Sequence, residues 1–240
     1  MSPILLIPAR MASSRLPGKP LADIAGRPMI VRVWEQAVAA GLGPVAVAAA
    51  EPEIVRAVTA AGGRAVLTDP ALASGSDRVF AALAELDPEG RHDVVINLQG
   101  DLPALDPADI RAVAAALAGA DIATLAAEIT DPAERDNPSV VKAVVAWEPD
   151  GKKGRALYFT RATAPSGDGP LFHHVGIYAY TRAALTRFVG LPPSPLEKRE
   201  KLEQLRALEA HMSIAVARVD RVPLSVDTQA DLERANRLLK

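Results

Sequence analysis

The chain has 240 residues, of which 49% are hydrophobic and 23% charged, and its formal net charge at pH 7 is −2. This length and composition are typical of one globular domain, and the missing basic surplus argues against nucleic acid as the main partner. The absence of cysteine excludes disulfides, thiolate zinc sites and a cysteine nucleophile. We find neither a signal peptide nor an apolar run near the about 20 residues of a membrane span, so we expect a cytoplasmic protein without membrane insertion.

Short apolar runs alternate with helical patterns in the first half of the chain. Continuous apolar runs are typical of strands that are buried on both faces of a parallel sheet, and they occur at residues 4–7, 45–48 and 94–98. Helical spacing of apolar residues covers residues 29–40, 53–61 and 77–86. This order predicts a three-layer, Rossmann-like α/β fold with a mainly parallel sheet and right-handed crossovers.

The second half carries clear helix starts and a less regular middle. Capping patterns begin at Asp106, Ser194 and Thr228. Strand-like patterns at residues 140–147 and 174–180 flank a stretch rich in Gly, Lys and Pro. We therefore expect a single domain over residues 1–240. Its insert would cover about residues 123–180, in which residues 150–169 form a mobile excursion at a subunit interface.

Three cations and two hydroxyls follow the first predicted strand: Arg10, Ser13, Ser14, Arg15 and Lys19. Parallel sheets bind ligands at the carboxyl edge of their strands, where this loop must lie. Arg offers forked donors, Lys a point charge, and loop N–H groups add further donors for phosphate oxygens. The loop matches neither the P-loop nor the G-x-G-x-x-G pattern. It favours a phosphate site, and the alternative is an exposed basic loop in which Pro and Gly only set turns.

Two carboxylates follow other strand-like stretches. Asp101 comes shortly after residues 94–98, and Asp227 precedes the last predicted helix. Mg²⁺ is usually held by one or two carboxylates together with substrate phosphates, so these residues predict a magnesium site. Each also has a purely structural interpretation, as a turn residue or as a helix cap.

The remaining polar residues are ambiguous by pattern alone. Ser74 and Arg78 lie at a predicted helix start, where a nucleotide could approach the backbone, but an ordinary N-cap explains them as well. Further candidates for an acidic polyhydroxy substrate are Arg161, His174, Tyr178, Glu203 and Gln204. A salt-bridged arginine, a hydrogen-bonded histidine at a strand end and a helix with a leucine core face are the alternatives for these residues.

Taken together, these motifs resemble the 3-deoxy-manno-octulosonate cytidylyltransferases, or CMP-KDO synthetases. The densest match is IPARMASSRLPGKPL at residues 7–21. Further matches follow in order at residues 74–78, 97–101, 137–142, 156–161, 174–178, 193–197, 202–206 and 226–228. The pattern covers nearly the whole chain, whereas the first loop alone indicates only a nucleotidyltransferase.

The resemblance implies a magnesium-dependent transfer of CMP from CTP to the anomeric hydroxyl of KDO, for the lipopolysaccharide of a Gram-negative cell. It also implies a nucleotidyltransferase fold with a small inserted dimerisation region, and a homodimer. The implied catalytic residues are Lys19, Asp101 and Asp227, with both aspartates on Mg²⁺. Nucleotide binding is implied for Arg10, Ser13, Arg15, Lys19, Ser74 and Arg78. A KDO pocket is implied for Gln99, Arg161, His174, Tyr178, Glu203 and Gln204, with Arg161 opposite the sugar carboxylate.

Two departures from the family and three rival functions qualify this resemblance. Leu102 stands where relatives often have Glu, so the second acid at that point is missing. Residues 48–50 are all Ala where relatives often have Asp, so no ligand contact is expected at residues 48–50. One rival is a cytidylyltransferase for 8-amino-KDO, and another is one for a sialic acid, which ranks lower because those enzymes have a Gly-rich first loop. A catalytically silent nucleotide-binding module is the third.

Overall fold

The computed structural model describes all residues from Met1 to Lys240, and the chain forms two compact units. The first unit comprises Met1–Arg111 and Pro223–Lys240, and the second comprises Ala112–Val222. No helix in the chain is long and apolar enough to cross a membrane. The residues 123–180 that we expect as an insert all belong to the second unit.

The first unit is built on four parallel strands in the order β5-β4-β1-β6. Its strands are β1 (Pro3–Ala9), β4 (Val45–Ala49), β5 (Arg64–Leu67) and β6 (Val94–Asn97), with a small hairpin of β2 (Asp23–Ile24) and β3 (Arg27–Pro28). Its helices are η1 (Lys19–Leu21), α1 (Met29–Ala39), α2 (Pro52–Ala60), α3 (Gly75–Leu86), α4 (Pro107–Ala116), which runs on into the second unit, and α9 (Gln229–Leu238). These bounds confirm the strands and helices predicted for the first half.

The order of these strands determines where a ligand can bind. The chain moves outward from β1 to β4 and β5, and then returns past β1 to β6. Right-handed crossovers therefore place α1 and α2 on one face and α3 on the other. The direction of the chain across the sheet thus reverses between β1 and β6, and such a switch point leaves a crevice at the carboxyl ends of these two strands.

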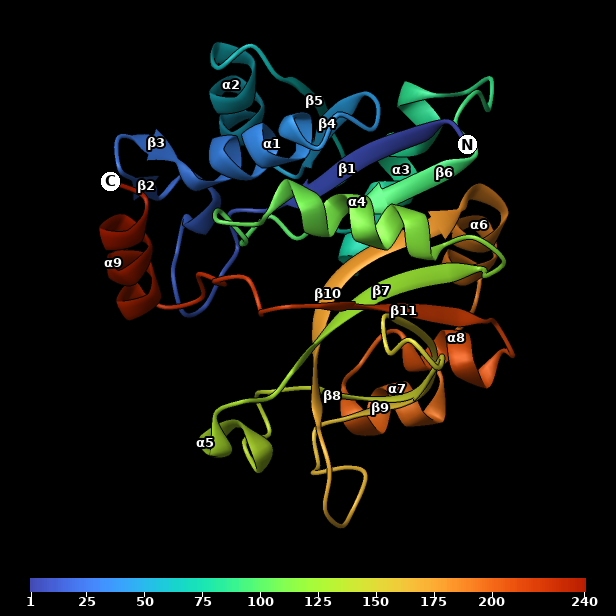
Figure 1. Cartoon of the computed structure of the whole chain (residues 1–240). Helices are drawn as coiled ribbons and strands as arrows, with labels where there is room; N and C mark the ends of the chain where they lie inside the picture. Colours follow the sequence, from blue (N-terminus) through green and yellow to red (C-terminus); the bar gives the residue numbers. More distant parts are fainter. The chain divides into compact units, whose positions relative to one another are not determined.

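The C-terminal helix packs against the beginning of the chain. Figure 1 shows α9 beside β2 and β3. A buried apolar cluster joins them: Leu16, Ile24, Met29, Val226 and Ala235, with Leu224, Leu232 and Leu239 packed against it. The Asn236 side chain adds polar contacts, because it accepts from the Ala25 N–H at 2.8 Å and donates to the Asp23 carbonyl at 3.1 Å. The segment before α9 is thereby held close to the first loop.

The second unit has five strands in the order β10-β7-β11-β9-β8, and a further β10–β8 pairing closes this order on itself. Its strands are β7 (Ile122–Glu128), β8 (Lys142–Trp147), β9 (Lys153–Thr160), β10 (Phe172–Thr181) and β11 (Ile214–Val219). Its other helices are α5 (Pro132–Arg135), α6 (Arg182–Val189), α7 (Pro195–Glu200) and α8 (Leu205–Glu209). Only β7 and β11 pair in parallel, and the other pairs are antiparallel.

Two expectations need correction here. A mainly parallel sheet describes the first unit only, because short connections such as the one from β8 to β9 join antiparallel strands in the second. Residues 150–169 are not simply a mobile excursion, since 153–160 form β9, which pairs with β8 and β11. Gly and Lys are uncommon in strands, so the local sequence did not predict β9. Its pairing with β8 and β11 determines which of its residues are buried.

Candidate active site

A cleft of about 400 Å³ lies in the first unit at the crevice that the strand order predicts. Its walls come from the loops after β1 and β6, the start of α3 and the segment before α9. The charged side chains that line it are Arg10, Arg15, Lys19, Arg78, Asp101 and Asp227. With four cations against two carboxylates, the charged side chains of the cleft carry a net positive charge, which suits an anionic ligand.

The backbone of the first loop is shaped by its own sequence. The Ser13 hydroxyl accepts the Leu16 N–H at 3.3 Å, as in a serine turn. Gly18 has φ +71°, a left-handed conformation that favours glycine, and its N–H donates to the Met11 carbonyl at 3.3 Å. The short helix η1 then begins at Lys19 with Pro20 buried beneath it. These turns aim the Lys19 side chain into the cleft.

Lys19 joins the two predicted metal carboxylates. Its ammonium lies 2.8 Å from Asp101 Oδ2 and 2.9 Å from Asp227 Oδ1, and the Arg15 guanidinium lies 3.1 Å from the same Asp227 oxygen. Burial is the largest effect on the pKa of Lys19 and lowers it. The charges and hydrogen bonds of the two aspartates outweigh burial, so the pKa is raised. Lys19 is therefore a fixed positive charge in this cleft.

Asp227 is available to the cleft because its neighbour caps the following helix. The Thr228 hydroxyl accepts the Asp231 N–H at 3.3 Å, and the Asp231 carboxylate accepts the N–H groups of Asp227 and Thr228. This is a capping box, and it satisfies the first turn of α9 without the Asp227 side chain. The Val226 N–H also donates to the Asp101 carbonyl at 3.0 Å, which ties the two carboxylate-bearing segments together.

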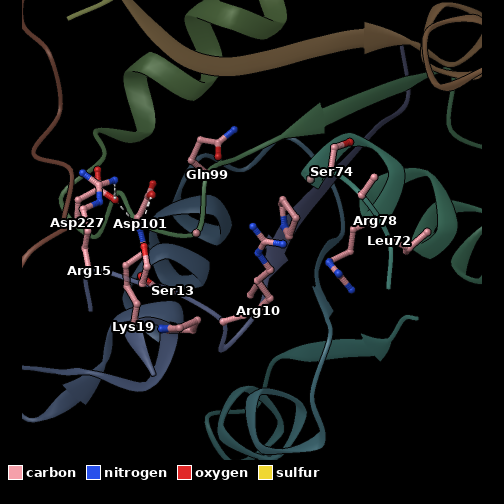
Figure 2. Close-up of a pocket in the computed structure, with 18 residues that line it drawn as sticks. Arg10, Ser13, Arg15, Lys19, Leu72, Ser74, Arg78, Gln99, Asp101 and Asp227 are labelled. Carbon is pink, nitrogen blue, oxygen red and sulfur yellow. Dashed lines mark hydrogen bonds and ion pairs between the residues drawn. The ribbon is translucent and has the colours of Figure 1, made fainter. Parts of the chain in front are cut away.

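Arg78 stands at the other end of the cleft. Figure 2 shows Asp101 and Asp227 beside Arg15 at one end, Arg10 in the middle, and Ser74 and Arg78 opposite. Arg78 is only 2% exposed, and its Nη1 donates to Thr68 Oγ1 at 2.6 Å and to the Asp69 carbonyl at 3.1 Å. Its Nη2 has no hydrogen-bond partner. A buried donor without a partner is costly, and a bound ligand that accepts from Nη2 would remove this cost.

Ser74 has a structural role that the sequence also predicted. Its hydroxyl accepts the Asp77 N–H and donates to the Asp77 carboxylate, so it forms the capping box of α3. Because it also lines the cleft, the helix start faces the ligand site. Gly100 lies opposite, where an added Cβ would come within 3.0 Å of the Pro8 carbonyl. A side chain at this position would therefore require the backbone after β6 or the end of β1 to shift.

The donor set of Asp101 and Asp227 fits a hard cation such as Mg²⁺. Their oxygens already converge on one cationic group, the Lys19 ammonium. They form no part of a cluster of three or more His, Asp or Glu side chains, and the structure contains no such cluster. Two carboxylates without a third ligand match a cation whose remaining ligands are water and substrate phosphate oxygens.

The second unit brings together part of the predicted sugar pocket. His174 is 8% exposed, its Nε2 lies 2.9 Å from Thr124 Oγ1, and Gln204 Nε2 lies 3.5 Å from His174 Nδ1. The single O–H of Thr124 is shared between the carbonyls of Val175 and Ile177, so the hydroxyl oxygen accepts from Nε2 of the histidine, and Nδ1 accepts from the Gln204 amide. Burial lowers the pKa of His174 to about 3, and the charge of His173 adds to this effect.

Tyr178 lies near this histidine, and Glu203 lies near Tyr178. The rings of His174 and Tyr178 have their centroids 5.6 Å apart. Burial, with smaller contributions from Tyr180 and Glu203, raises the pKa of Tyr178 well above its ordinary value. The phenol therefore stays protonated and acts as a donor. Of the six predicted sugar-binding residues, only Gln99 lines the cleft of the first unit.

Arg161 is occupied by protein groups in this structure. Its backbone N–H donates to the Glu200 carboxylate at 2.9 Å, and its Nε donates to the Glu200 carbonyl at 2.9 Å. Nη1 donates to the Pro138 carbonyl at 3.0 Å and Nη2 to the Lys201 carbonyl at 3.5 Å. The guanidinium thus links the loop before β8 to the end of α7, and any carboxylate would have to share or displace these contacts.

Two further residues shape the cleft without having been predicted from the sequence. Thr68 bridges the Arg78 guanidinium and the Ala49 carbonyl, at the carboxyl end of β4. Glu51 accepts the Met11 N–H at 2.9 Å from the same strand end. Glu51 follows the parallel strand β4 and Thr68 follows the parallel strand β5. This position after a strand was the only feature of the sequence that could have indicated a role in the cleft. Residues 48–50 are buried and Leu102 is 6% exposed, and none of them lines the cleft.

Comparisons with known proteins identify the family of this chain. The family model described as cytidylyltransferase matches residues 4–214. The chain belongs to the cytidylyltransferase family. Two relatives named 3-deoxy-manno-octulosonate cytidylyltransferase are 66% identical over 240 residues, in Rhodospirillum centenum, and 67% identical over 239 residues, in Parvibaculum lavamentivorans. Each alignment covers 99% of this chain, and 93% and 92% of the respective relative.

A solved structure gives the same assignment at the level of the fold. It is described as CMP:2-keto-3-deoxy-manno-octonic acid synthetase complexed with CTP, and it superposes with a TM-score of 0.90 at 40% identity. The match covers 100% of this chain and 98% of that one. The predicted family is thus confirmed, and this cytidylyltransferase shares its fold with a relative that binds CTP.

Proposed function

We propose that this cytidylyltransferase transfers CMP from CTP to the anomeric hydroxyl of 3-deoxy-D-manno-octulosonate, giving CMP-KDO and pyrophosphate. The observation that carries the proposal is the convergence of Lys19, Asp101 and Asp227 in a cationic cleft at the carboxyl edge of a parallel sheet. A triphosphate needs cations along its length and a metal site at one end, and this cleft supplies both kinds of group.

In this reaction the sugar hydroxyl oxygen bonds to the α-phosphorus and the hydroxyl loses its proton. The bond from that phosphorus to the oxygen bridging the α- and β-phosphates breaks, and pyrophosphate leaves. Arg10, Arg15 and Lys19 stabilise the negative charge that grows on the leaving group, while the loop N–H groups orient the phosphates. No covalent intermediate with the protein is needed.

Asp101 and Asp227 would hold Mg²⁺, which when bound screens the phosphate charges and lowers the pKa of the attacking hydroxyl. The two carboxylates are 25% and 34% exposed in their side chains, so a hydrated cation has access to them. When a triphosphate draws Lys19 and Arg15 onto its oxygens, the carboxylates lose their present partners. Nucleotide and metal would therefore bind in a mutually supportive way.

At the other end of the cleft, Arg78 and Ser74 would meet the cytosine. The unpaired Nη2 of the buried Arg78 is a donor for a base oxygen or ring nitrogen, and the guanidinium is held rigidly by Thr68 and Asp69. Such a preorganised donor discriminates between bases because a mismatched base would leave it buried and unpaired.

For the sugar acid we propose Gln99, Arg161, His174, Tyr178, Glu203 and Gln204 as binding residues. Neutral His174, protonated Tyr178 and the Gln204 amide suit hydroxyl groups, because each offers hydrogen bonds without a net charge. Arg161 would pair with the sugar carboxylate, and its present bonds to backbone carbonyls would then be exchanged for a charged partner.

Pyrophosphate release tests the function directly. The purified protein would be assayed with CTP, UTP, ATP and GTP, each with KDO, 8-amino-KDO or a sialic acid, and with and without Mg²⁺. Release that requires CTP, KDO and Mg²⁺ together supports the proposal. Preference for 8-amino-KDO or a sialic acid would reassign the acceptor, and no release in any combination would favour a silent nucleotide-binding module.

We further propose a cytoplasmic homodimer that acts in lipopolysaccharide biosynthesis and uses no nucleic acid. The location is supported by the substrate, since CTP is a cytoplasmic nucleotide, and the dimer by the family resemblance. Light scattering coupled to size-exclusion chromatography measures the mass in solution directly. A mass of one chain, 25.2 kDa, would contradict the dimer without affecting the proposed reaction.

A further inference from the structure

Glu51 stands at the carboxyl end of β4, directly before α2. It occupies the N-cap position of α2, but its side chain caps no helix N–H. Instead Oε2 accepts the backbone N–H of Met11 at 2.9 Å, in the loop that follows the neighbouring strand β1. A carboxylate that could have capped its own helix therefore holds another loop.

Met11 is the second residue of that loop, directly after Arg10. Its carbonyl accepts the N–H of Gly18 at 3.3 Å, so both polar groups of this residue are engaged. The residues between the two contacts include Ser13 and Arg15, and Lys19 follows immediately. Without Glu51 the Met11 N–H would lose its partner, and the start of the loop would be tied to the end of β4 only through the Ala50 N–H on the Ala9 carbonyl.

The negative charge of Glu51 also lies near the cationic side chains of the cleft, because both Glu51 and Arg10 act on the pKa of Arg78. Burial is the main effect that lowers the pKa of Arg78, and the nearby charge of Arg10 lowers it further. The Glu51 carboxylate opposes both effects. Glu51 does not line the cleft, so it offsets this repulsion without facing the phosphates.

The same strand end supports the opposite side of the cleft. The Ala49 carbonyl accepts the Thr68 hydroxyl at 2.9 Å, and that hydroxyl in turn accepts Nη1 of Arg78. Ala50 donates its N–H to the Ala9 carbonyl at 2.9 Å, which aligns the ends of β4 and β1. The three consecutive residues 49–51 thus connect β4 to both walls of the cleft.

We infer that Glu51 is a positioning residue for nucleotide binding, which holds the Met11 amide and thereby presents Arg10, Arg15 and Lys19 to a triphosphate. The inference rests on the proposed function only in taking a nucleoside triphosphate as the ligand of the cleft. Glu51 positions cations that bind the phosphates both before and during the reaction. We therefore expect loss of Glu51 to raise the KM for CTP and to change kcat little.

The test compares Glu51→Ala and Glu51→Gln with Glu53→Ala, a control at an exposed glutamate two residues further along in the same helix start. Glutamine keeps an oxygen that accepts the Met11 N–H, whereas alanine has none. Calorimetry measures the Kd of CTP and of inorganic tripolyphosphate, and steady-state kinetics separates KM from kcat. Amide hydrogen exchange at Met11 reports the hydrogen bond itself, and thermal unfolding checks the fold.

For Glu51→Ala we expect an about tenfold weaker Kd for both ligands, faster exchange at Met11, and kcat within about twofold of wild type. Glu51→Gln should retain protection at Met11 and bind within about threefold of wild type, and Glu53→Ala should match it. Wild-type affinity in Glu51→Ala, or a glutamine variant as weak as the alanine variant, overturns the inference.

These outcomes separate the inference from the proposed function. If the wild-type protein binds CTP and tripolyphosphate but releases no pyrophosphate with KDO, the proposed acceptor is wrong. The comparison of the Glu51 variants by tripolyphosphate binding then still decides the role of Glu51. Should Glu51→Ala fail to fold, a folded Glu51→Gln variant that loses Met11 protection and still binds tripolyphosphate like wild type would overturn the inference by itself.

Discussion

Lys19 and Asp101 are 82 residues apart in the sequence, yet the ammonium of one lies 2.8 Å from a carboxylate oxygen of the other. The same ammonium lies 2.9 Å from Asp227, so one lysine bridges both carboxylates proposed for the metal. The contact shows how the site can be stable without ligand, since each carboxylate has a cation beside it.

Asp101→Asn should reduce CMP transfer about a thousandfold while leaving the fold intact, a loss in the range seen when one electrostatic group is removed from a catalytic site. The amide retains the shape and one acceptor but cannot serve as an anionic metal ligand. Pyrophosphate release measures the effect. Asp106→Asn is the control, because Asp106 is exposed and its turn to the Ala108 N–H is preserved by asparagine. Near-wild-type turnover in Asp101→Asn would refute the metal assignment.

Lys19→Met should have opposite effects on the two ligands. It removes the cation that now occupies both carboxylates, so the nucleotide-free protein should bind Mn²⁺ about thirtyfold more tightly, given about 1 kcal/mol for each of the two partly exposed ion pairs. Binding of CTP should weaken, because one of the phosphate cations is gone. Titration calorimetry with Mn²⁺ alone and with CTP alone measures both. Mn²⁺ affinity equal to or below wild type would contradict this competition.

Thr228→Ala should lower both stability and activity, because the cap of α9 also positions Asp227. Loss of a helix cap costs about 1 kcal/mol, and for a chain of this size it lowers Tm by about 2–4 °C. The freed Asp231 carboxylate no longer orders the Asp227 N–H in the same way, so kcat should fall as well. Thr228→Ser keeps the hydroxyl and should behave like wild type. Unchanged activity at a lowered Tm would show that the cap stabilises α9 without positioning Asp227.

The buried His174 predicts a pH dependence of stability. Its folded-state pKa of about 3 lies below the ordinary value of 6.5, so between these values only the unfolded chain takes up the proton. Its contribution is complete above pH 6.5 and is lost progressively down to about pH 3, by at most about 5 kcal/mol.

Denaturant unfolding at several pH values tests this dependence on His174. In His174→Gln the free energy of unfolding should fall less steeply over that window than in wild type. His211→Asn serves as the control, since His211 is exposed and has φ +58°, a conformation that asparagine tolerates. Parallel pH profiles of wild type and His174→Gln would show that His174 is not the group responsible.

Much of the first unit could be predicted from local pattern. The apolar runs around Ile4 and Val95 match β1 and β6, because strands buried on both faces carry no competing polar signal. The helix that begins after Ser74 was predicted from its cap, and the capping box is present. The second unit was predicted less well, since β9 alternates buried and exposed residues within a Gly- and Lys-rich stretch and depends on pairing with β8 and β11.

The sequence by itself determined the family, the cationic loop and the two acidic residues, because residue types and their order are local information. Only the tertiary structure decided that Lys19 bridges both aspartates, that Thr228 rather than Asp227 caps α9, and that Glu51 holds the Met11 amide. The physical reason is the strand order, which brings segments from residues 10, 51, 101 and 227 to neighbouring strand ends. Hydrogen bonds between such distant segments depend on that geometry, and no spacing along the chain encodes it.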